Sequence, residues 1–199
     1  MSFRKEKKFR LSYSDMYNLR EELFRNGMKE LHLPRLVNSC YFDNYMLSMF
    51  HESEEGVLPR KKFRVRWYNE ENIFTKETKV SSVEGRFKYT EKLDQLNSIQ
   101  EVKEIDICDQ MYGYLKPTLI VSYKREYFSY EDLRITIDTS IGYIDLRKAI
   151  SQNYLDDECV MEIKTSIDTP DDYIEKVIPN PTSRFSKYSR GLLKADGML

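Results

Sequence analysis

The chain has 199 residues, of which 33% are charged and 13% aromatic, and its formal net charge is −1. This composition argues against a disordered tail or a membrane protein and is typical of a soluble globular chain. No Pro-, Gly- or Ser-rich linker divides the chain, so one domain over residues 1–199 is expected. The near-zero net charge argues against a generally basic nucleic-acid binder, and no nucleic-acid polymer is expected as a partner.

Cysteine and histidine usage narrows the chemistry further. Cys40, Cys108 and Cys159 are far apart and form no C-x-x-C pair, so neither a disulfide framework nor a thiolate zinc site is indicated and a cytoplasmic location is expected. His32 and His51 are the two histidines of the chain, too few for a multi-histidine metal site. Any metal must therefore be held by carboxylates, which favours Mg²⁺ or Mn²⁺. No targeting or membrane-spanning segment is visible.

The first half of the chain reads mainly as strands. A helix is expected after Ser14 as N-cap, with a stripe of Met16, Leu19 and Leu23 and a stop at Asn26 and Gly27. A second, short helix is expected within 44–56. Alternating polar and apolar residues predict strands over 3–11, 36–43, 61–68, 72–80 and 83–89.

The second half continues the same pattern. Two short helices are expected over 91–107, and strands over 118–128, 133–139 and 158–165. A helix over about 171–177, a Pro-rich turn and a last amphipathic piece over 183–194 close the chain. About eight meandering strands with a helical minority predict an α+β fold whose sheet is largely antiparallel.

The stretch 60–68 shows the clearest alternation. Phe63, Val65 and Trp67 share one parity, and the opposite parity carries Arg60, Lys62, Arg64 and Arg66. Because side chains alternate faces along a strand, one face of this strand is apolar and the other is a row of cations.

Two interpretations of the charged faces stay open. A one-sided antiparallel sheet can pack its apolar face on a core and leave its charges in water. The charged parities, however, recur on strand after strand, and their few acids stand two residues from a lysine, as in Glu77 with Lys79. If the sheet closes with these faces inward, they line a channel whose self-repulsion a polyanion would relieve. Arg and Lys groups would match a polyphosphate or a nucleotide triphosphate.

The chain resembles the vacuolar transporter chaperone (VTC) domain, the polyphosphate polymerase branch of the triphosphate tunnel metalloenzymes, which also include the CYTH triphosphatases. The matching pieces occur in the family's order over nearly the whole chain. They are Tyr41-Phe42-Asp43, the run 63–68 (Phe-Arg-Val-Arg-Trp-Tyr), Glu77-Thr78-Lys79, the run 134–139 (Arg-Ile-Thr-Ile-Asp-Thr), Glu162-Ile163-Lys164 and the run 185–188 (Phe-Ser-Lys-Tyr).

The resemblance implies an antiparallel β-barrel tunnel of about eight strands with flanking helices, which binds ATP and inorganic polyphosphate. It assigns catalysis to Arg64, Arg66, Lys79 and Glu162. It places Glu162 on the metal, Mn²⁺ or Mg²⁺, with Asp138 as a second candidate ligand. The phosphate-binding residues that it implies are Arg4, Lys8, Arg64, Arg66, Lys79, Lys88, Arg125, Arg134, Lys164, Ser186 and Lys187.

Several of these assignments have alternatives. Arg86 could replace Lys88 as the inward residue of its strand. Asp138 could pair with Arg134 instead of assisting a metal, and Ser186 could be only a helix cap. Glu162 with Lys164, like Glu77 with Lys79, could be a surface cross-strand pair.

Two departures from the family pattern bear on activity. The first strand carries only Glu6 where the CYTH branch has Glu-x-Glu-x-Lys, which disfavours a two-metal triphosphatase. The chain also shows no regulatory or membrane domain, so coupling to translocation, a membrane-bound partner and the oligomeric state stay open.

The resemblance implies transfer of the ATP γ-phosphoryl group to a growing polyphosphate chain. Such transfer needs in-line geometry and charge stabilisation more than covalent chemistry from the protein, which agrees with the scarcity of histidine. No G-x-x-x-x-G-K-[ST] loop is present. The rival interpretations are a tunnel triphosphatase that hydrolyses triphosphate or nucleotides, and a non-catalytic polyphosphate-binding module.

Overall fold

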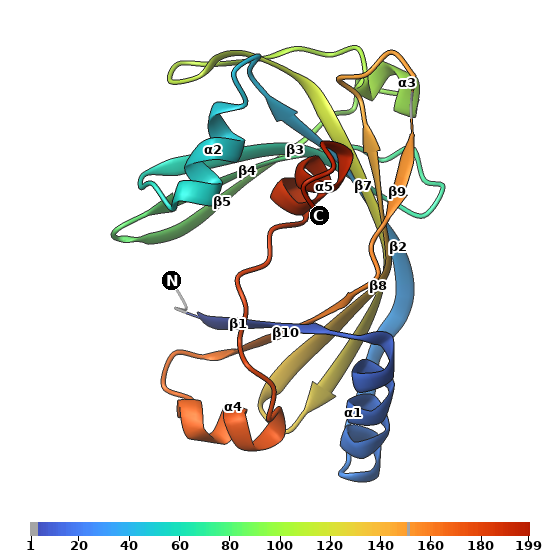
Figure 1. The fold of residues 1–199 in the computed structure, drawn as a ribbon, viewed down its shortest axis with the longest axis vertical. Coiled ribbons are helices and arrows are strands. Elements are labelled where there is room, and N and C mark those ends of the chain that lie inside the picture. Colours follow the sequence, from blue (N-terminus) through green and yellow to red (C-terminus); the bar gives the residue numbers. More distant parts are fainter. Residues whose placement is uncertain (1–3, 151) are drawn as a thin grey trace. The chain divides into compact units, whose positions relative to one another are not determined.

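The structure is a computed structural model and describes residues 4–150 and 152–199. Within these residues the chain forms ten strands and five helices (Figure 1). The helices are α1 (Tyr13–Arg25), α2 (Ser48–Glu55), α3 (Ile99–Val102), α4 (Asp171–Val177) and α5 (Lys187–Ala195). The strands are β1 (Arg4–Leu11), β2 (Lys29–Asp43), β3 (Arg60–Tyr68), β4 (Thr75–Ser82), β5 (Gly85–Lys92), β6 (Ile107–Asp109), β7 (Gly113–Tyr130), β8 (Leu133–Asp145), β9 (Asn153–Leu155) and β10 (Cys159–Ser166).

The strands form one sheet in the order β1-β10-β8-β7-β2-β3-β4-β5, with β6 added on β7 and β9 on β8. The pairs β1–β10, β10–β8, β2–β3, β3–β4, β4–β5 and β6–β7 are all antiparallel. An α+β fold built on an antiparallel sheet of about eight main strands with flanking helices is therefore confirmed. None of the helices in residues 4–150 and 152–199 is long and apolar enough to cross a membrane.

Sequence patterns located every long strand but missed some boundaries. β2 begins at Lys29, well before the predicted start at residue 36, and β6 and β9 were not predicted. The first helix is capped by Ser12, whose side chain accepts a hydrogen bond from the Asp15 backbone N–H, and not by Ser14.

The prediction of two short helices over 91–107 is wrong for its first part. β5 continues to Lys92, and only α3 is helical in this stretch. Leu93 and Leu96 are buried in the same core as Phe74, and the Leu93 backbone N–H donates to the Phe74 carbonyl at 2.9 Å. Their spacing of three residues therefore reflects a turn that packs on the core.

Backbone contacts group the chain into two compact units. The first comprises the described residues up to Leu36 together with 123–141 and 155–185. The second comprises 37–122, the described part of 142–154, and 186–199. β2, β7 and β8 contribute residues to both units.

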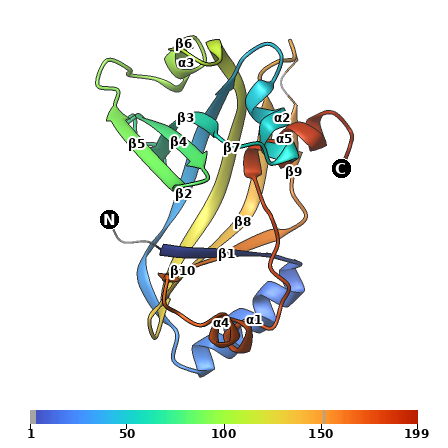
Figure 2. The same ribbon diagram turned by 90° about the vertical axis from the view of Figure 1, so that its left-hand side faces the viewer.

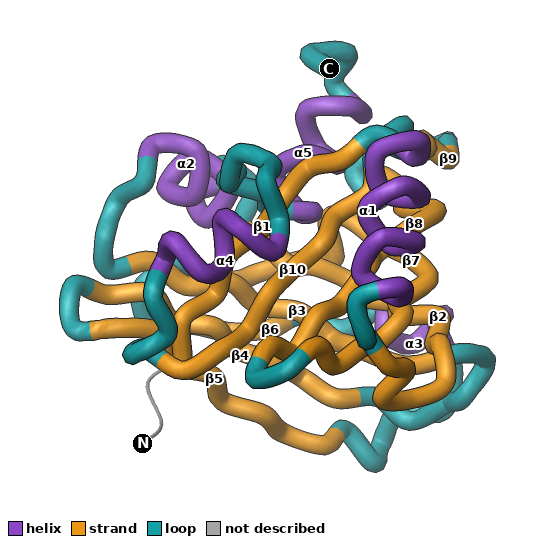
Figure 3. The backbone as a smooth tube through the Cα atoms, turned by 90° about the horizontal axis from the view of Figure 1, so that it is seen from below, coloured by secondary structure: helices purple, strands orange, loops and turns teal. Residues whose placement is uncertain are grey.

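In the first unit, α1 and α4 cover one face of β1 and β10 (Figure 3). Phe9 of β1, Ile137 of β8 and Met161 of β10 are buried on this face. They pack in one cluster with Leu19 of α1 and Ile174 of α4. The even-numbered residues of β1 and β10 lie on the opposite face, whereas Lys5 and Lys7 share the parity of Phe9 and pair with Asp171 of α4.

In the second unit, β3, β4 and β5 lie side by side (Figure 2). Phe63, Val65 and Trp67 of β3 are buried in a cluster that includes Met49 of α2 and Val102 of α3. The apolar parity of β3 thus packs in one core with residues of α2 and α3. The even-numbered cations of β3 therefore lie on the other face.

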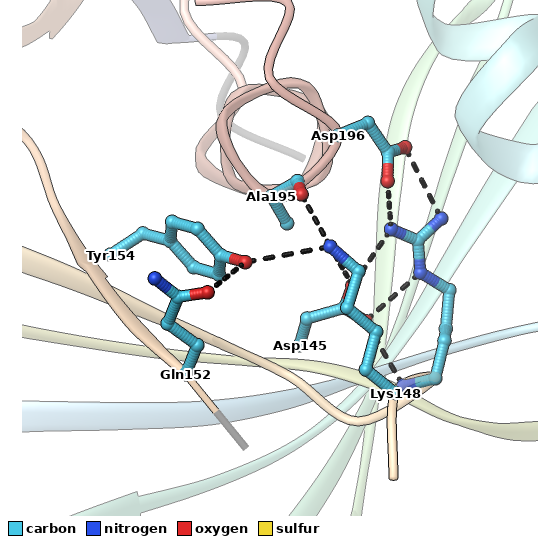
Figure 4. A network of polar contacts seen from close by, with 7 residues as sticks. Asp145, Lys148, Gln152, Tyr154, Ala195 and Asp196 are labelled. Carbon is cyan, nitrogen blue, oxygen red and sulfur yellow. Dashed lines mark hydrogen bonds and ion pairs between the residues drawn. The ribbon is translucent and has the colours of Figure 1, made fainter. Parts of the chain in front are cut away.

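Helix α5 is fastened at its C-terminal end by a polar network that Figure 4 shows. Arg147 donates to both oxygens of buried Asp145, each at 2.9 Å, and to Asp196 at 2.7 Å. Lys148 donates to the backbone carbonyl of Ala195, in the last turn of the helix, and to Tyr154 at 3.4 Å. A cation at this end also interacts favourably with the helix dipole.

The middle of α5 approaches the sheet closely at Gly191. A Cβ atom placed on Gly191 would lie 2.4 Å from Cδ1 of Tyr143 and 2.6 Å from Cδ2 of Leu119, both in the core of the second unit. Only glycine fits this contact without movement of the helix or of both side chains.

We predict that Gly191→Ala destabilises the protein by about 1–3 kcal/mol through overpacking. Helix propensity alone predicts the opposite sign, a gain of about 1 kcal/mol, because alanine is the better helix former. Urea unfolding of both proteins measures the difference. A variant as stable as the wild type, or more stable, would show that the contact relaxes freely.

Candidate functional site

The second unit presents a cationic face on β3, β4 and β5, opposite to the apolar core. The strand register aligns Arg64 with Glu77, and Lys62 with Lys79 and Lys88. This face carries eight cations and a single carboxylate, that of Glu77. The cations are Arg60, Lys62, Arg64, Arg66, Lys79, Arg86, Lys88 and Lys92.

Arg64 is the centre of this face and only 8% exposed. Its Nε donates to Glu77 Oε2 at 2.7 Å, and its Nη2 contacts the same oxygen. Its Nη1 donates to the Tyr41 hydroxyl at 3.0 Å. Lys88 Nζ lies 2.6 Å from the other oxygen of Glu77. Glu77 thus joins two cations, and Tyr41 takes a third donor of the guanidinium group.

These cations set the ionisation of their neighbours. Burial alone would raise the pKa of Glu77, but Arg64, Arg66 and the hydrogen bond from Lys88 outweigh it and hold the pKa at about 2. Burial would likewise raise the pKa of Tyr41, but Arg64, Arg66 and Lys79 outweigh it and lower the pKa to about 7. The field of this face is therefore strong enough to favour a phenolate.

Tyr41 packs against a second tyrosine, Tyr188 of α5. Its ring stacks on that of Tyr188 at 5.1 Å between centroids, and the Tyr188 hydroxyl donates to Asp43 at 2.7 Å. Asp43 also accepts from the backbone N–H groups of Met49 and Phe50 in the first turn of α2. Burial raises the pKa of Asp43 in spite of these bonds, and burial together with Asp43 raises that of Tyr188.

The remaining cations of this face differ in burial and in their contacts. Arg66 is buried, and its Nε donates to the Ser39 hydroxyl at 3.2 Å. Lys62 is half-buried and donates to Ser186 Oγ at 2.9 Å. Lys79 is exposed.

Ser186 is the N-cap of α5, since its side chain accepts from the Ser189 backbone N–H. It is more than a cap, because it also accepts from Lys62. Lys187 follows as the first residue of the helix and is half-buried. Arg86 and Lys88 lie on the same face, and it is Lys88 that contacts Glu77.

The first unit presents a separate charged face, on β1, β10 and β8. The register aligns Lys8 with Glu162 and Glu162 with Thr136. Lys8 Nζ lies 3.4 Å from Glu6 and 3.9 Å from Glu162, and it donates to the Phe185 carbonyl at 3.3 Å.

The side chain of Glu162 is more deeply buried than those of Glu6 and Glu158. Lys164 Nζ lies 2.8 Å from its Oε1. Burial alone would raise its pKa, but Lys164 and Lys8 outweigh it and lower the pKa to about 2. The carboxylate is therefore ionised at neutral pH.

Asp138 and Arg125 form a buried ion pair in this unit. Arg125 Nε and Nη2 donate to the two oxygens of Asp138 at 2.6 and 2.7 Å. Burial would lower the pKa of Arg125, but Asp138 outweighs it and raises the pKa well above its usual value. The sequence left open a pair between Asp138 and Arg134; in the structure Asp138 pairs with Arg125.

Arg134 and Arg4 are the remaining predicted residues of the first unit. Arg134 is exposed and aligns with Lys164 on the charged face. The backbone of Arg4 starts β1 opposite Ser166, and its side chain lies outside the described part of the chain.

The donor set for a divalent metal is small. Within residues 4–150 and 152–199, no three carboxylate, histidine or cysteine groups gather as a metal cluster. Glu6 and Glu162 both lie within 4 Å of Lys8 Nζ. Mg²⁺ is commonly held by one or two carboxylates, with waters and substrate phosphates as further ligands, so this pair fits such an ion. Asp138 as a ligand stays a prediction, since Arg125 binds both its oxygens.

Sequence reasoning missed two residues of the cationic face. Tyr41 was part of a matching motif without a role, and Glu77 was considered only as a partner of Lys79. Both contact Arg64. Glu77 shares the parity of Lys79, and this pattern could have placed Glu77 on the cationic face. The position of Tyr41 opposite Arg64 depends on the β2–β3 register, which no local pattern shows.

We predict that Glu77→Gln lowers the free energy of unfolding at pH 7 by about 3 kcal/mol, because it leaves Arg64 without its buried counter-charge. The pKa of Glu77 falls from 4.5 to about 2 on folding. Its stabilising contribution is therefore complete above the higher value and is lost as the pH falls toward the lower one. Urea unfolding of both proteins from pH 7 to pH 3 should show the gap closing; a gap independent of pH would contradict this.

We further predict that one tyrosine ionises at a pH of about 7 and that Tyr41→Phe removes this step. Absorbance of tyrosinate at about 295 nm follows the titration directly. Tyr173→Phe is a matched control, because the pKa of that hydroxyl is raised to about 12. Loss of the low step in Tyr173→Phe, or its survival in Tyr41→Phe, would refute the assignment.

Comparison with solved structures shows that the fold is shared. A conserved hypothetical protein from Pyrococcus furiosus aligns over 94% of this chain and 99% of its own, with 12% identity and a TM-score of 0.56. A candidate adenylyl cyclase from Hippeastrum, described as having a dominant triphosphatase activity, aligns over 99% and 97% with 14% identity and a TM-score of 0.54. A candidate adenylate cyclase from Vibrio parahaemolyticus aligns over 96% and 98%, with 12% identity and a TM-score of 0.53.

No curated protein matches the chain significantly. The family model described as the VTC domain matches residues 3–195, nearly the whole chain. The resemblance inferred from the sequence motifs is thereby confirmed, and the chain belongs to the VTC domain family.

Proposed function

We propose that this domain is a metal-dependent polyphosphate polymerase, which transfers the γ-phosphoryl group of ATP to a growing polyphosphate chain. The observation that carries the proposal is the face of β3, β4 and β5, where eight cations meet one carboxylate. Like charges at this density repel one another, so a polyanion that lies on the face stabilises it.

Arg64 and Arg66 are the phosphate ligands that this proposal needs most. Both are buried, so their interaction with an anion is screened less than that of a surface charge. Arg66 donates from its Nε to the Ser39 hydroxyl and lies on the same face of β3 as Arg64. Lys79, Lys88 and the pair Lys62–Ser186 extend the face for successive phosphates of a chain.

In this proposal the phosphoryl transfer takes place at the charged face of the first unit. Glu162, with Glu6, would hold the divalent metal, which when bound neutralises charge on phosphate oxygens. Lys8, Lys164 and Arg125 are the cations beside Glu162 that offset the charge of the transferred group. The attacking group, a terminal phosphate, is already anionic at neutral pH and needs no histidine base.

The second candidate is a triphosphatase, which the same residues would serve with water as the nucleophile. The activity described for the Hippeastrum protein favours it, because that protein shares the fold. The presence of Glu6 alone in place of the Glu-x-Glu-x-Lys pattern favours the polymerase. A non-catalytic polyphosphate-binding module is the third candidate.

We predict that incubation with ATP and Mn²⁺ yields long-chain polyphosphate, measured on gels and by release of ADP. Glu162→Gln should abolish synthesis, and Lys79→Ala should weaken tripolyphosphate binding about tenfold through loss of one charged contact. Lys76→Ala is the matched control, since Lys76 lies on the opposite parity of β4 and pairs with Glu91.

Each outcome selects one function. Orthophosphate without polyphosphate would assign hydrolysis. Binding of tripolyphosphate without any turnover, in the wild type and in Glu162→Gln alike, would assign a binding module. An active Glu162→Gln enzyme would refute the metal assignment.

A further inference from the structure

Thr136 lies at the centre of the charged face of the first unit. It stands on β8 between Arg134 and Asp138 of the same parity, and the β10–β8 register aligns it with Glu162. Lys8 of β1 is aligned with Glu162 from the other side. Ile135 and Ile137, which flank Thr136 in the sequence, are buried in the apolar core. The Thr136 side chain is therefore on the opposite face, which carries the charges.

The hydroxyl group of Thr136 is buried without a hydrogen-bond partner. The residue is 5% exposed. In the part of the chain that the structure describes, its Oγ1 makes no hydrogen bond. Most buried hydroxyl groups are bonded, because an unpaired one loses its water without compensation. An unpaired buried hydroxyl on the face of a candidate site is a candidate to bind a ligand.

The carboxylate beside it does not take this hydroxyl. Lys164 lies 2.8 Å from Oε1 of Glu162, and Lys8 lies 3.9 Å from Oε2. Both oxygens of Asp138 accept from Arg125. The nearby carboxylates thus already have cationic partners, and the Thr136 hydroxyl can donate its hydrogen bond to a ligand.

We propose that Thr136 is a phosphate ligand, whose hydroxyl donates a hydrogen bond to an oxygen of the bound triphosphate or polyphosphate. The proposal rests on the proposed function and adds a residue that the family resemblance does not assign. A phosphate oxygen suits this position, because Lys8 and Lys164 can contact the same group while the hydroxyl supplies a short, directional bond.

The test compares Thr136→Val with Thr136→Ser. Valine keeps the shape and removes the hydroxyl, whereas serine keeps the hydroxyl. Tripolyphosphate binding by calorimetry should weaken about 5–20-fold in Thr136→Val and stay within about twofold of wild type in Thr136→Ser. In the absence of ligand, the Tm of Thr136→Val should be equal to or higher than that of the wild type, since an unpaired buried hydroxyl is removed.

Thr165→Val is the matched control. Thr165 lies on β10 with the opposite parity, is also buried, and its hydroxyl is 2.6 Å from that of Thr169. Its loss should lower the Tm by about 2–4 °C and leave tripolyphosphate binding unchanged. The two valine variants are therefore expected to separate the two measurements: Thr136→Val weakens binding without lowering the Tm, and Thr165→Val lowers the Tm without weakening binding.

The outcomes separate this inference from the proposed function. If the wild type binds tripolyphosphate and Lys164→Ala weakens it, but Thr136→Val binds as tightly as the wild type, only the role of Thr136 is refuted. A lower Tm of unliganded Thr136→Val with unchanged affinity would refute it in favour of a structural hydroxyl. Failure of the wild type to bind tripolyphosphate would refute both proposals.

Discussion

Repulsion between like charges is the constraint on which the cationic face of the second unit depends. Strand alternation directs eight cations of β3, β4 and β5 to one side, where Glu77 is their one carboxylate. Glu77 is buried and contacts both Arg64 and Lys88, so each of its oxygens offsets a cation where screening by water is weakest. The remaining charge is what a bound anion would neutralise, and the depressed pKa of Tyr41 shows its strength.

The position of Arg64 also depends on a series of contacts that leads from Tyr41 to α2. Tyr41 accepts from its Nη1, Tyr188 stacks on Tyr41, and the hydroxyl of Tyr188 donates to Asp43. Asp43 is itself bonded to the first turn of α2. An arginine fixed in this way has already lost much of its side-chain freedom, so the proposed phosphate binding would profit from preorganisation.

Much of this arrangement could be predicted from the sequence, and the reason is periodicity. The alternation of Phe63, Val65 and Trp67 with Arg64 and Arg66 is a local property, and burial of the apolar parity fixes which side the arginines take. The same holds for Glu162 and Lys164 on β10. These residues lie where their parity predicted.

Partnerships across strands could not be predicted, because they depend on register. Asp138 pairs with Arg125 of β7, and Tyr41 meets Arg64 through the β2–β3 alignment. The spacing of Leu93 and Leu96 predicts a helix, but a spacing of three residues also suits a turn that packs on a core, and a turn is what forms there. Thr136 gave no signal at all, since a threonine in a strand is ordinary until its burial and its lack of a partner are known.

The two charged faces differ in the balance of their charges, and this bears on their chemistry. On the face of the first unit, Lys8 and Lys164 stand beside Glu6 and Glu162, and Arg125 is matched by Asp138. The face of the second unit is almost purely cationic. Binding a polyanion needs only the second kind of surface, whereas a metal-assisted reaction needs ionised carboxylates to hold the metal. Glu162, with a pKa of about 2, is ionised at neutral pH and can bind a metal without first releasing a proton.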